Sequence, residues 1–279
     1  RLSPTLYHSA QLYKGKATPK ALSRGTLDMG VPGVWQLSSY DTNADITSLP
    51  RFYGQSPKAA RILVDGEWGR KLSQSLEKKM RVKVLGKFYE LGYLHTFMVT
   101  KPITKLDDFK GLKIRYPAAP VHALRIKALG ASPMMIPFAD VPMALLQGTV
   151  DGLLTSFKTA DGVKLDESGM KYATKDYWAL LHYAPMVSQK FWNSLPKDLQ
   201  KIMKEVWNEH VDDERRIAVK MQDEAEAALE KRGVKIYRPD EQQRAKWRQH
   251  ILPSQEAFVR KMKMDVNLVN RAKEILGMK

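Results

Sequence analysis

The chain of 279 residues contains no cysteine. This absence excludes disulfide bonds and thiolate metal sites, and it is compatible with an oxidising compartment, where a free thiol is a liability. Long hydrophobic runs are missing too, because no apolar stretch approaches the ~18 residues that suggest a membrane-spanning helix. The start, Arg1-Leu2-Ser3-Pro4, lacks the apolar segment of a secretory signal peptide, so an exported protein would be a processed form.

Signatures of catalysis and of metal binding are also missing. No phosphate-binding loop, dinucleotide fingerprint or Gly-x-Ser-x-Gly sequence occurs, and the 6 histidines include no pair spaced i, i+4. Residues 209–214 group acidic side chains with a histidine, but on a helix these side chains point around the axis, which favours a solvated face. The Ser-x-x-Lys sequence at Ser75 is too short to indicate an enzyme without its partner motifs. We therefore expect no enzyme, no resident metal and no cofactor.

Acidic residues are scarce relative to basic ones, and the formal net charge is +16. Such a balance often marks a nucleic-acid-binding protein. The excess is spread along the chain, however, no basic run alternates with aromatic residues, and no zinc-finger or RNP-type motif is present. We therefore expect no nucleic-acid partner and interpret the charge as a mild attraction for small anions.

The residues that are present predict an α/β fold. Short apolar strands alternate with helices of about ten residues, which is typical of βα units and favours largely parallel sheets. The length suits two modest domains. We predict strands over residues 27–31, 82–85, 93–99, 111–117, 134–136 and 234–237, and the end of a strand with its exit loop over residues 6–13. We predict helices over residues 19–24, 57–65, 67–79, 120–129 and 196–232, and from residue 240 onward with a break near Pro253.

Two features of the pattern indicate a pair of lobes. Residues 19–28 match residues 142–151, with Pro, Ala, Leu, Gly, Thr and Asp in register, as two similarly built lobes facing one cleft would. The helix predicted over residues 196–232 is long enough, at about 1.5 Å per residue, to reach along both lobes. Because no Gly/Ser linker separates the lobes, several chain crossings should join them and restrict their motion to opening and closing about a hinge.

The most informative stretch is residues 111–117, a short buried strand that follows a turn glycine and ends at Pro117. Arg115 stands at the end of this strand, which is the edge where open α/β sheets bind ligands. Its guanidinium is always charged, and its planar fork fits a carboxylate through two parallel hydrogen bonds. Taken alone, an arginine in this setting is more often a surface or structural ion-pair residue.

The sequence around Arg115 resembles the central signature of the DctP-type solute-binding proteins of TRAP (tripartite ATP-independent periplasmic) transporters. The resemblance is carried by four ordered blocks, at residues 110–117, 127–133, 137–141 and 144–152, and extends over nearly all of the chain. It implies a two-lobed periplasmic-binding-protein fold with a hinged cleft and a long helix that bridges both lobes. It also implies that Arg115 clamps the carboxylate of the ligand.

The resemblance also suggests limits for the two lobes. Lobe I is expected over residues 1–92 with 181–220, and its opening strand and helix are expected to be missing from this sequence. Lobe II, which carries the clamping arginine, is expected over residues 93–180 with 221–279.

Further site residues follow from the same resemblance. His95 precedes Arg115 at a distance where several family members carry a second cationic or hydrogen-bonding group. Phe138 matches the aromatic residue that borders the ligand. Thr155 stands in place of an asparagine that meets the same carboxylate in the commoner family pattern, and its hydroxyl can still donate one hydrogen bond. Without the resemblance, His95 and Phe138 would be interpreted as structural residues.

Trp35 and Phe157 lie in the counterpart segments that follow the matching stretches of the two lobes, so we expect them to line opposite walls of the cleft. From the sequence alone they would be core aromatics. Two aromatic walls and fewer amides indicate a ligand less polar than a sugar acid, such as an aromatic or a short aliphatic acid.

The expected function is that of a periplasmic solute-binding protein. It would capture a small organic acid, leave it chemically unchanged, and deliver it to the membrane subunits of a TRAP transporter. The alternative is a receptor of the same fold that feeds a sensor kinase or a chemoreceptor. The two would share a pocket and differ in their docking surface.

Overall fold

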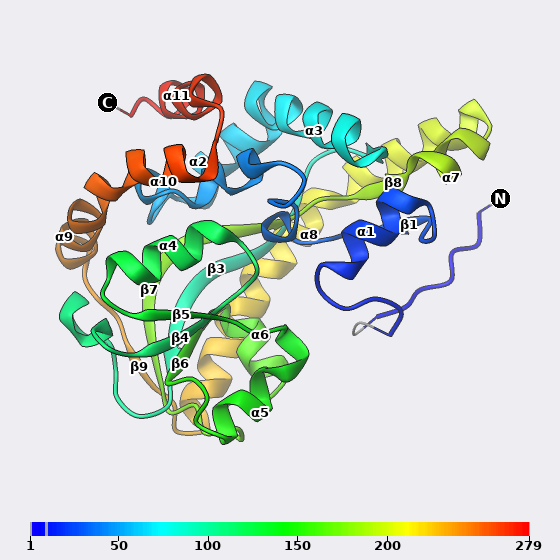
Figure 1. Cartoon of the computed structure of the whole chain (residues 1–279). Helices are drawn as coiled ribbons and strands as arrows, with labels where there is room; N and C mark the ends of the chain where they lie inside the picture. The colour runs from blue at the N-terminus through cyan, green and yellow to red at the C-terminus, as the bar shows by residue number, and fades with distance from the viewer. Residues whose placement is uncertain (1, 9–10, 279) are drawn as a thin grey trace.

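The computed structural model describes residues 2–8 and 11–278. The chain forms two α/β lobes, each built around its own sheet, as the sequence predicts (Figure 1). A three-stranded sheet lies in lobe I and a six-stranded sheet in lobe II. Within the described residues, no helix is both long enough and apolar enough to cross a lipid bilayer.

The sheet of lobe I has the strand order β1-β8-β2, with β1 at Met29–Gly30, β8 at Met186–Ser188 and β2 at Val82–Val84. Both strand pairs are antiparallel. Helices α1 (Ala17–Arg24), α2 (Pro57–Asp65) and α3 (Glu67–Met80) pack around its core. Local signals set their ends: Ser56 caps α2 by accepting from the Ala59 amide at 3.2 Å, and Gly25 ends α1 with a φ of 70°.

The sheet of lobe II has the strand order β5-β4-β6-β3-β7-β9. Its strands are β3 (Tyr89–Met98), β4 (Lys113–Tyr116), β5 (Ser132–Met135), β6 (Gly152–Thr155), β7 (Tyr172–Tyr183) and β9 (Lys235–Tyr237). β4 runs parallel to β5 and β6, and β9 parallel to β7, whereas β3 is antiparallel to both of its neighbours.

The expectation of largely parallel sheets is therefore wrong. It fails completely for lobe I, and in lobe II the sheet is mixed. The cause is β3, which enters lobe II from the hinge and so runs against β6 and β7. The direction of such a crossing strand depends on the tertiary path of the chain, which strand patterns do not encode.

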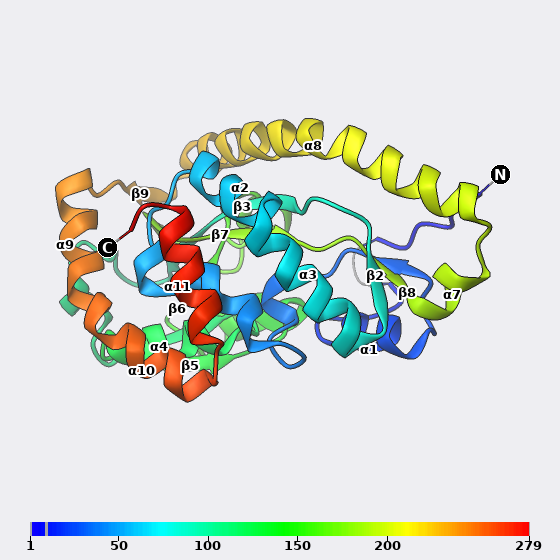
Figure 2. The same ribbon diagram turned by 90° about the horizontal axis from the view of Figure 1, so that it is seen from above.

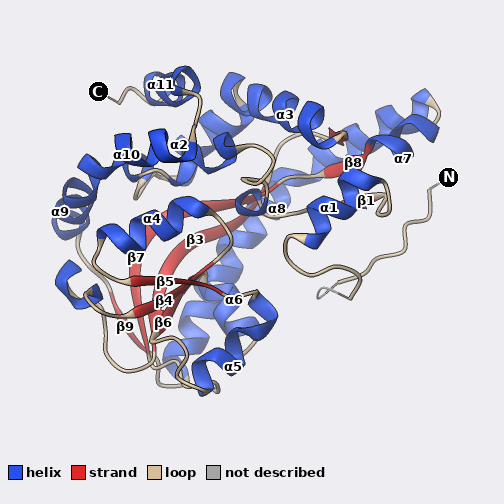
Figure 3. Ribbon diagram, in the orientation of Figure 1, coloured by secondary structure: helices blue, strands red, loops and turns tan. Residues whose placement is uncertain are grey.

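Helices cover both faces of the lobe II sheet (Figure 3). One face packs on α4 (Pro120–Ala128) and α9 (Glu241–Ile251), through side chains such as Ile114 and Leu154. The other face carries Phe97 and Leu153 and packs on α5 (Val141–Leu146), α6 (Phe157–Gly162) and the long helix α8 (Lys197–Lys231). A further short helix, α7 (Gln189–Ser194), follows β8.

The two lobes are joined by β3, β7 and α8, and Figure 2 shows α8 running along almost the whole molecule. This 35-residue helix confirms the predicted bridging helix. Arg215 of α8, 1% exposed, fixes it to lobe I: its Nη1 and Nη2 donate to Asp65 at 2.7 and 2.8 Å, and its Nε donates to the Phe88 carbonyl at 3.0 Å. The hinge is therefore held by paired strands and one anchored helix.

The C-terminal helices return to lobe I. α10 (Gln255–Met262) and α11 (Val266–Ile275) place Phe258, Val269 and Ala272 in the lobe I core, and α11 contacts α2 and α3. The sequence assigned residues 221–279 to lobe II; the packing of α11 on α2 and α3 differs from that expectation, whereas α10 also contacts α4 of lobe II. The apolar pattern of these helices predicted that they are helical but not which core they cover. The other lobe limits stay predictions.

Several element bounds also differ from the predictions. The strand expected over residues 27–31 is reduced to β1, and the one expected over 134–136 begins earlier as β5. Residues 6–8 and 11–13 form no strand; Leu6 and Tyr7 are exposed, so no sheet covers them. Residues 9 and 10 of that prediction lie outside the described residues. The break near Pro253 is confirmed, because a short 3₁₀ turn at Leu252–Ser254 separates α9 from α10.

Candidate functional site

Arg115 lies near the carboxyl end of β4 and is only 5% exposed. Its Nε donates to the Ile136 carbonyl at 3.0 Å, and its Nη1 donates to the Leu154 carbonyl at 3.4 Å. The guanidinium also lies 5.7 Å from the centre of the Phe138 ring. The strand register therefore directs this side chain over β6.

No carboxylate among residues 2–8 and 11–278 forms an ion pair with Arg115, and its Nη2 makes no hydrogen bond to them. Burial lowers the pKa of Arg115 to about 10, so the guanidinium is still charged at neutral pH. A buried charge is expensive unless it is paired. This arginine therefore lacks the partner that would offset its burial, and a carboxylate would supply it.

Thr155 and His95 lie on the same face of the sheet as Arg115, in the next row of side chains. Thr155 pairs with His95 across β6 and β3, while Arg115 pairs with Leu153 across β4 and β6. Residues in register point to the same face, and so do residues two apart on one strand, so all three side chains share one face. Thr155 is 6% exposed, and its hydroxyl has no hydrogen-bond partner in the described part of the chain.

His95 is 3% exposed and offers a further donor. Its Nδ1 accepts from the Tyr177 amide at 3.1 Å, so in the neutral ring the proton belongs on Nε2. No described residue accepts from that Nε2. Burial lowers the pKa of His95, an effect that the buried carboxylate of Asp176, 3.5 Å from Nδ1, opposes in part. The ring is therefore neutral near pH 7.

The three predicted aromatic residues lie at different places. Phe157, the first residue of α6, is buried with its ring 5.1 Å from the His95 ring. Phe138 borders Arg115. Trp35 lies apart in lobe I, where its ring packs at 5.1 Å on Tyr183. No ring contact in the described residues joins Trp35 to Phe157 or Phe138.

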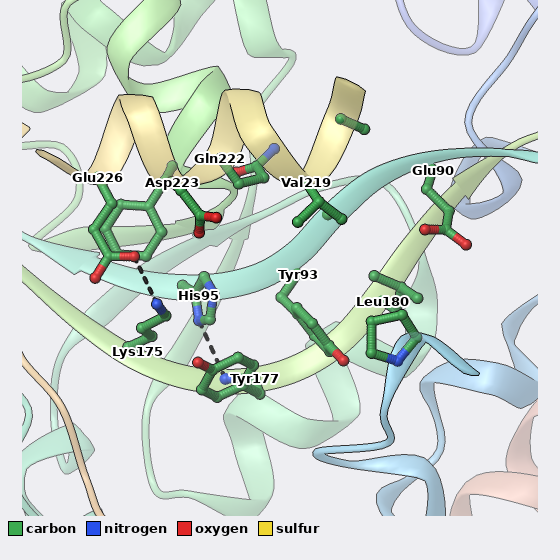
Figure 4. A pocket seen from close by; sticks show the side chains of 14 residues that line it. Glu90, Tyr93, His95, Lys175, Tyr177, Leu180, Val219, Gln222, Asp223 and Glu226 are labelled. Atoms are coloured by element: carbon green, nitrogen blue, oxygen red, sulfur yellow. Dashed lines mark hydrogen bonds and ion pairs between the residues drawn. The ribbon is translucent and has the colours of Figure 1, made fainter. Parts of the chain in front are cut away.

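A cavity of about 210 Å³ lies between the hinge strands β3 and β7 and helix α8 (Figure 4). His95 and Phe157 line it, whereas Arg115, Thr155, Phe138 and Trp35 do not. Its walls also include Tyr93, Tyr177 and Leu180 from the strands, and Ala218, Val219 and Asp223 from α8. His95 therefore lines the cavity and also lies on the sheet face that carries Arg115.

Sequence reasoning missed the other cavity residues. A signal existed for Tyr93, which precedes His95 by two residues on a predicted strand and so points to the same face. No local signal exists for Ala218 or Asp223, because they reach the cavity only through the path of α8 across the hinge.

Charges around the cavity are mostly paired. Lys175 and Arg238 bind Glu226, each at 2.7 Å, and Arg61 binds Glu90 at 2.7 and 2.8 Å. Asp223, on the exposed side of α8, forms no ion pair with a described residue. Among the described residues, no three His, Asp or Glu side chains are grouped to hold a metal ion.

Comparisons with known proteins agree on one family. The family model for bacterial extracellular solute-binding protein, family 7 (DctP), matches residues 1–261. The C4-dicarboxylate-binding periplasmic protein DctP of Rhodobacter capsulatus is 28% identical over 250 residues, which cover 89% of this chain and 74% of that protein. The sialic acid-binding periplasmic protein SiaP of Vibrio cholerae is 26% identical, over 84% of this chain and 72% of SiaP.

Solved structures share the fold. A TRAP periplasmic solute-binding protein from Sulfurospirillum deleyianum with bound succinate has a TM-score of 0.88 and 25% identity, covering 97% of this chain and 87% of that one. A second, from Sulfitobacter sp. NAS-14.1 with bound β-D-galacturonate, has a TM-score of 0.90 and 21% identity, covering 98% and 89%. The overall arrangement of the two lobes is therefore common to these proteins.

Proposed function

Because the chain belongs to the bacterial extracellular solute-binding proteins of family 7, we propose that it captures a small organic acid for a TRAP transporter and delivers it to the membrane subunits. The observation that carries the proposal is Arg115, a buried guanidinium with no carboxylate partner among the described residues. Similar proteins support it, because solved relatives hold succinate and β-D-galacturonate, both of which are carboxylates.

In this proposal, three unused donors converge on one carboxylate. Arg115 supplies Nη2 and the positive charge, Thr155 supplies its hydroxyl, and His95 supplies Nε2–H. The strand register, which puts these residues of β4, β6 and β3 on one face of the sheet, supports the assignment. Phe138 would border the clamp next to the guanidinium, and Phe157 would border it next to the imidazole. Trp35 would approach from lobe I when the lobes close.

Closure gives the clamp its strength. Bending about β3, β7 and α8 would bring the lobes together and expel water from the bound carboxylate, which strengthens its interaction with Arg115. A ligand that binds the closed form better than the open one shifts the population toward it. The membrane subunits would then recognise the closed form, and the acid would be released unchanged.

We place this process in the periplasm, where the similar proteins DctP and SiaP act according to their names. The alternative of a receptor that feeds a sensor kinase or a chemoreceptor is not favoured, because the relatives include TRAP solute-binding proteins. We propose no catalytic role, since the donors around Arg115 include no nucleophile paired with a base.

A thermal-shift screen against a library of organic acids tests the proposal, because a ligand that binds only the folded protein raises its melting temperature. Acids that stabilise the wild type should fail to stabilise Arg115→Gln. The matched control is Arg216→Gln on the surface of α8, where the parent side chain is 75% exposed. If the same acids stabilise Arg115→Gln as well as the control, the proposed clamp is wrong.

A further inference from the structure

The cavity between the hinge strands and α8 contains a donor that the protein itself leaves unused. His95 lines it and is 97% buried, since only 3% of the residue is exposed, yet no described residue accepts from its Nε2. This N–H is therefore free to donate to an acceptor in the cavity. The cavity is therefore a candidate binding compartment.

The cavity lies next to the proposed carboxylate clamp. Arg115 extends from β4 over β6, where its Nη1 donates to the Leu154 carbonyl at 3.4 Å. The next strand beyond β6 is β3, which carries His95, and the cavity continues from there to β7 and α8. β4 and β3 are two strand spacings apart, about 10 Å, and the Arg115 side chain spans part of this distance, so one small molecule can place its carboxylate at the clamp and its body past His95.

We propose that this cavity holds the body of the bound acid, and that the ligand is a monocarboxylate with one aromatic ring or a branched aliphatic chain of similar size. The inference rests on the proposed function and narrows its ligand class from small organic acids to monocarboxylates with an apolar body. It assigns a ligand role to Tyr93, Tyr177 and Ala218, which surround the space beyond His95.

The shape and lining of the cavity determine the body of the ligand. The rings of Tyr93 and Tyr177 meet edge to face at 4.8 Å, and the Tyr93 hydroxyl already donates to the Gln55 carbonyl at 2.5 Å. These rings therefore offer apolar surface. A cavity of roughly 150 Å³ accommodates benzene in an engineered protein, so the volume of about 210 Å³ in this protein suits one ring with a short side chain. The hydroxyls of a sugar acid would lose hydrogen bonds to water against these walls.

The charged side chains that line the cavity disfavour a second carboxylate. The ionisable side chains other than tyrosine and histidine that line it are Glu90, Asp223, Glu226 and a single Lys175. Lys175 already binds Glu226 at 2.7 Å, and Asp223 has no cationic partner among the described residues. A second carboxylate would lose water and meet like charge, so a dicarboxylate such as succinate should bind less well than a monocarboxylate with an apolar body.

The test fills the cavity from α8 without touching the clamp. Ala218→Trp places a large ring in the lining, and Ala227→Trp, at an exposed position of the same helix outside the cavity, is the matched control. Isothermal titration calorimetry on the full chain would use phenylacetate, pyruvate and succinate as probes. We expect Ala218→Trp to weaken phenylacetate binding at least tenfold and pyruvate binding less than twofold, and the control to change neither. Wild type should prefer phenylacetate to succinate.

Each outcome has a defined meaning. If Ala218→Trp leaves phenylacetate binding unchanged while Arg115→Gln abolishes it, the body lies elsewhere and the inference fails, but the proposed function stands. The same holds if wild type binds succinate more tightly than phenylacetate through Arg115. Binding of these acids that survives Arg115→Gln would overturn the proposed function itself. Circular dichroism checks folding; if Ala218→Trp is unfolded, Val219→Trp on the same wall replaces it, with the same expected results.

Discussion

Replacing Arg115 should separate ligand affinity from stability. Arg115→Met removes the charge and keeps much of the aliphatic volume. In the complex, the ligand carboxylate would then be desolvated without its charged partner, a loss of about 3–5 kcal/mol for a buried ion pair. This corresponds to at least about a hundredfold weaker binding.

The free protein should respond in the opposite way. The guanidinium is 5% exposed and, within the described residues, has only carbonyl acceptors and one aromatic ring around it. Its burial without an anion is therefore unfavourable, and removing the charge should change the free energy of unfolding by less than ~1 kcal/mol or raise it. If Arg115 only supported the sheet, its replacement would lower the free energy of unfolding of the protein.

Two measurements check this prediction. Calorimetry with an acid found in the thermal-shift screen gives the affinity of wild type, Arg115→Met and Arg115→Lys; the lysine variant keeps the charge but not the fork, so its affinity should be intermediate. Urea unfolding of the ligand-free proteins gives their stabilities. An affinity loss below fivefold would refute the clamp. A large loss of both affinity and ligand-free stability would show that Arg115 is mainly structural.

Three further predictions concern the clamp, the hinge and a buried acid. Thr155→Val keeps the shape but removes the free hydroxyl, and should weaken binding about tenfold in calorimetry; an unchanged affinity would remove Thr155 from the site. Arg215→Ala leaves Asp65 without its partner and should lower the free energy of unfolding by about 3 kcal/mol in urea; a loss below about 1 kcal/mol would mean that α8 is anchored by other contacts. Burial raises the pKa of Asp45 to about 7, so the folded state holds this proton more tightly than the unfolded state. The contribution of Asp45 to stability should therefore be greatest below about pH 4 and decline by roughly 2–4 kcal/mol up to pH 7. Asp45→Asn should remove that decline, and identical pH profiles of unfolding for the two proteins would contradict the assignment.

The sequence predicted those parts of the site that depend on neighbours along the chain. The turn glycine at Gly111 and the proline at Pro117 bound a short strand, so Arg115 had to stand near its carboxyl end. Thr155 stands where the commoner family pattern has an asparagine, and its hydroxyl has no hydrogen-bond partner among the described residues. Helix ends at Ser56 and Gly25 were likewise predictable, because caps act within one turn.

Contacts between segments that are distant in the sequence could not be predicted from local patterns. Trp35 is expected opposite Phe157, and this stays a prediction; nothing in the sequence indicated that its ring packs on Tyr183 of β7. The cavity beyond His95 depends on α8, whose residues come from more than a hundred positions later in the chain. No periodicity or spacing could reveal it, since a pattern specifies which face of a helix is apolar but not what covers that face.

By itself, the sequence determined that an arginine lies near the end of an inner strand, that helices such as α1 and α2 end or begin at their capping residues, and to which family the chain belongs. Only the tertiary structure decided that this arginine has no acidic neighbour among the described residues, that His95 turns an unused donor toward a cavity, and that α11 returns to lobe I. The reason is physical: caps and turns are set by interactions within a few residues. Burial, charge pairing and cavities arise where segments far apart in the chain meet.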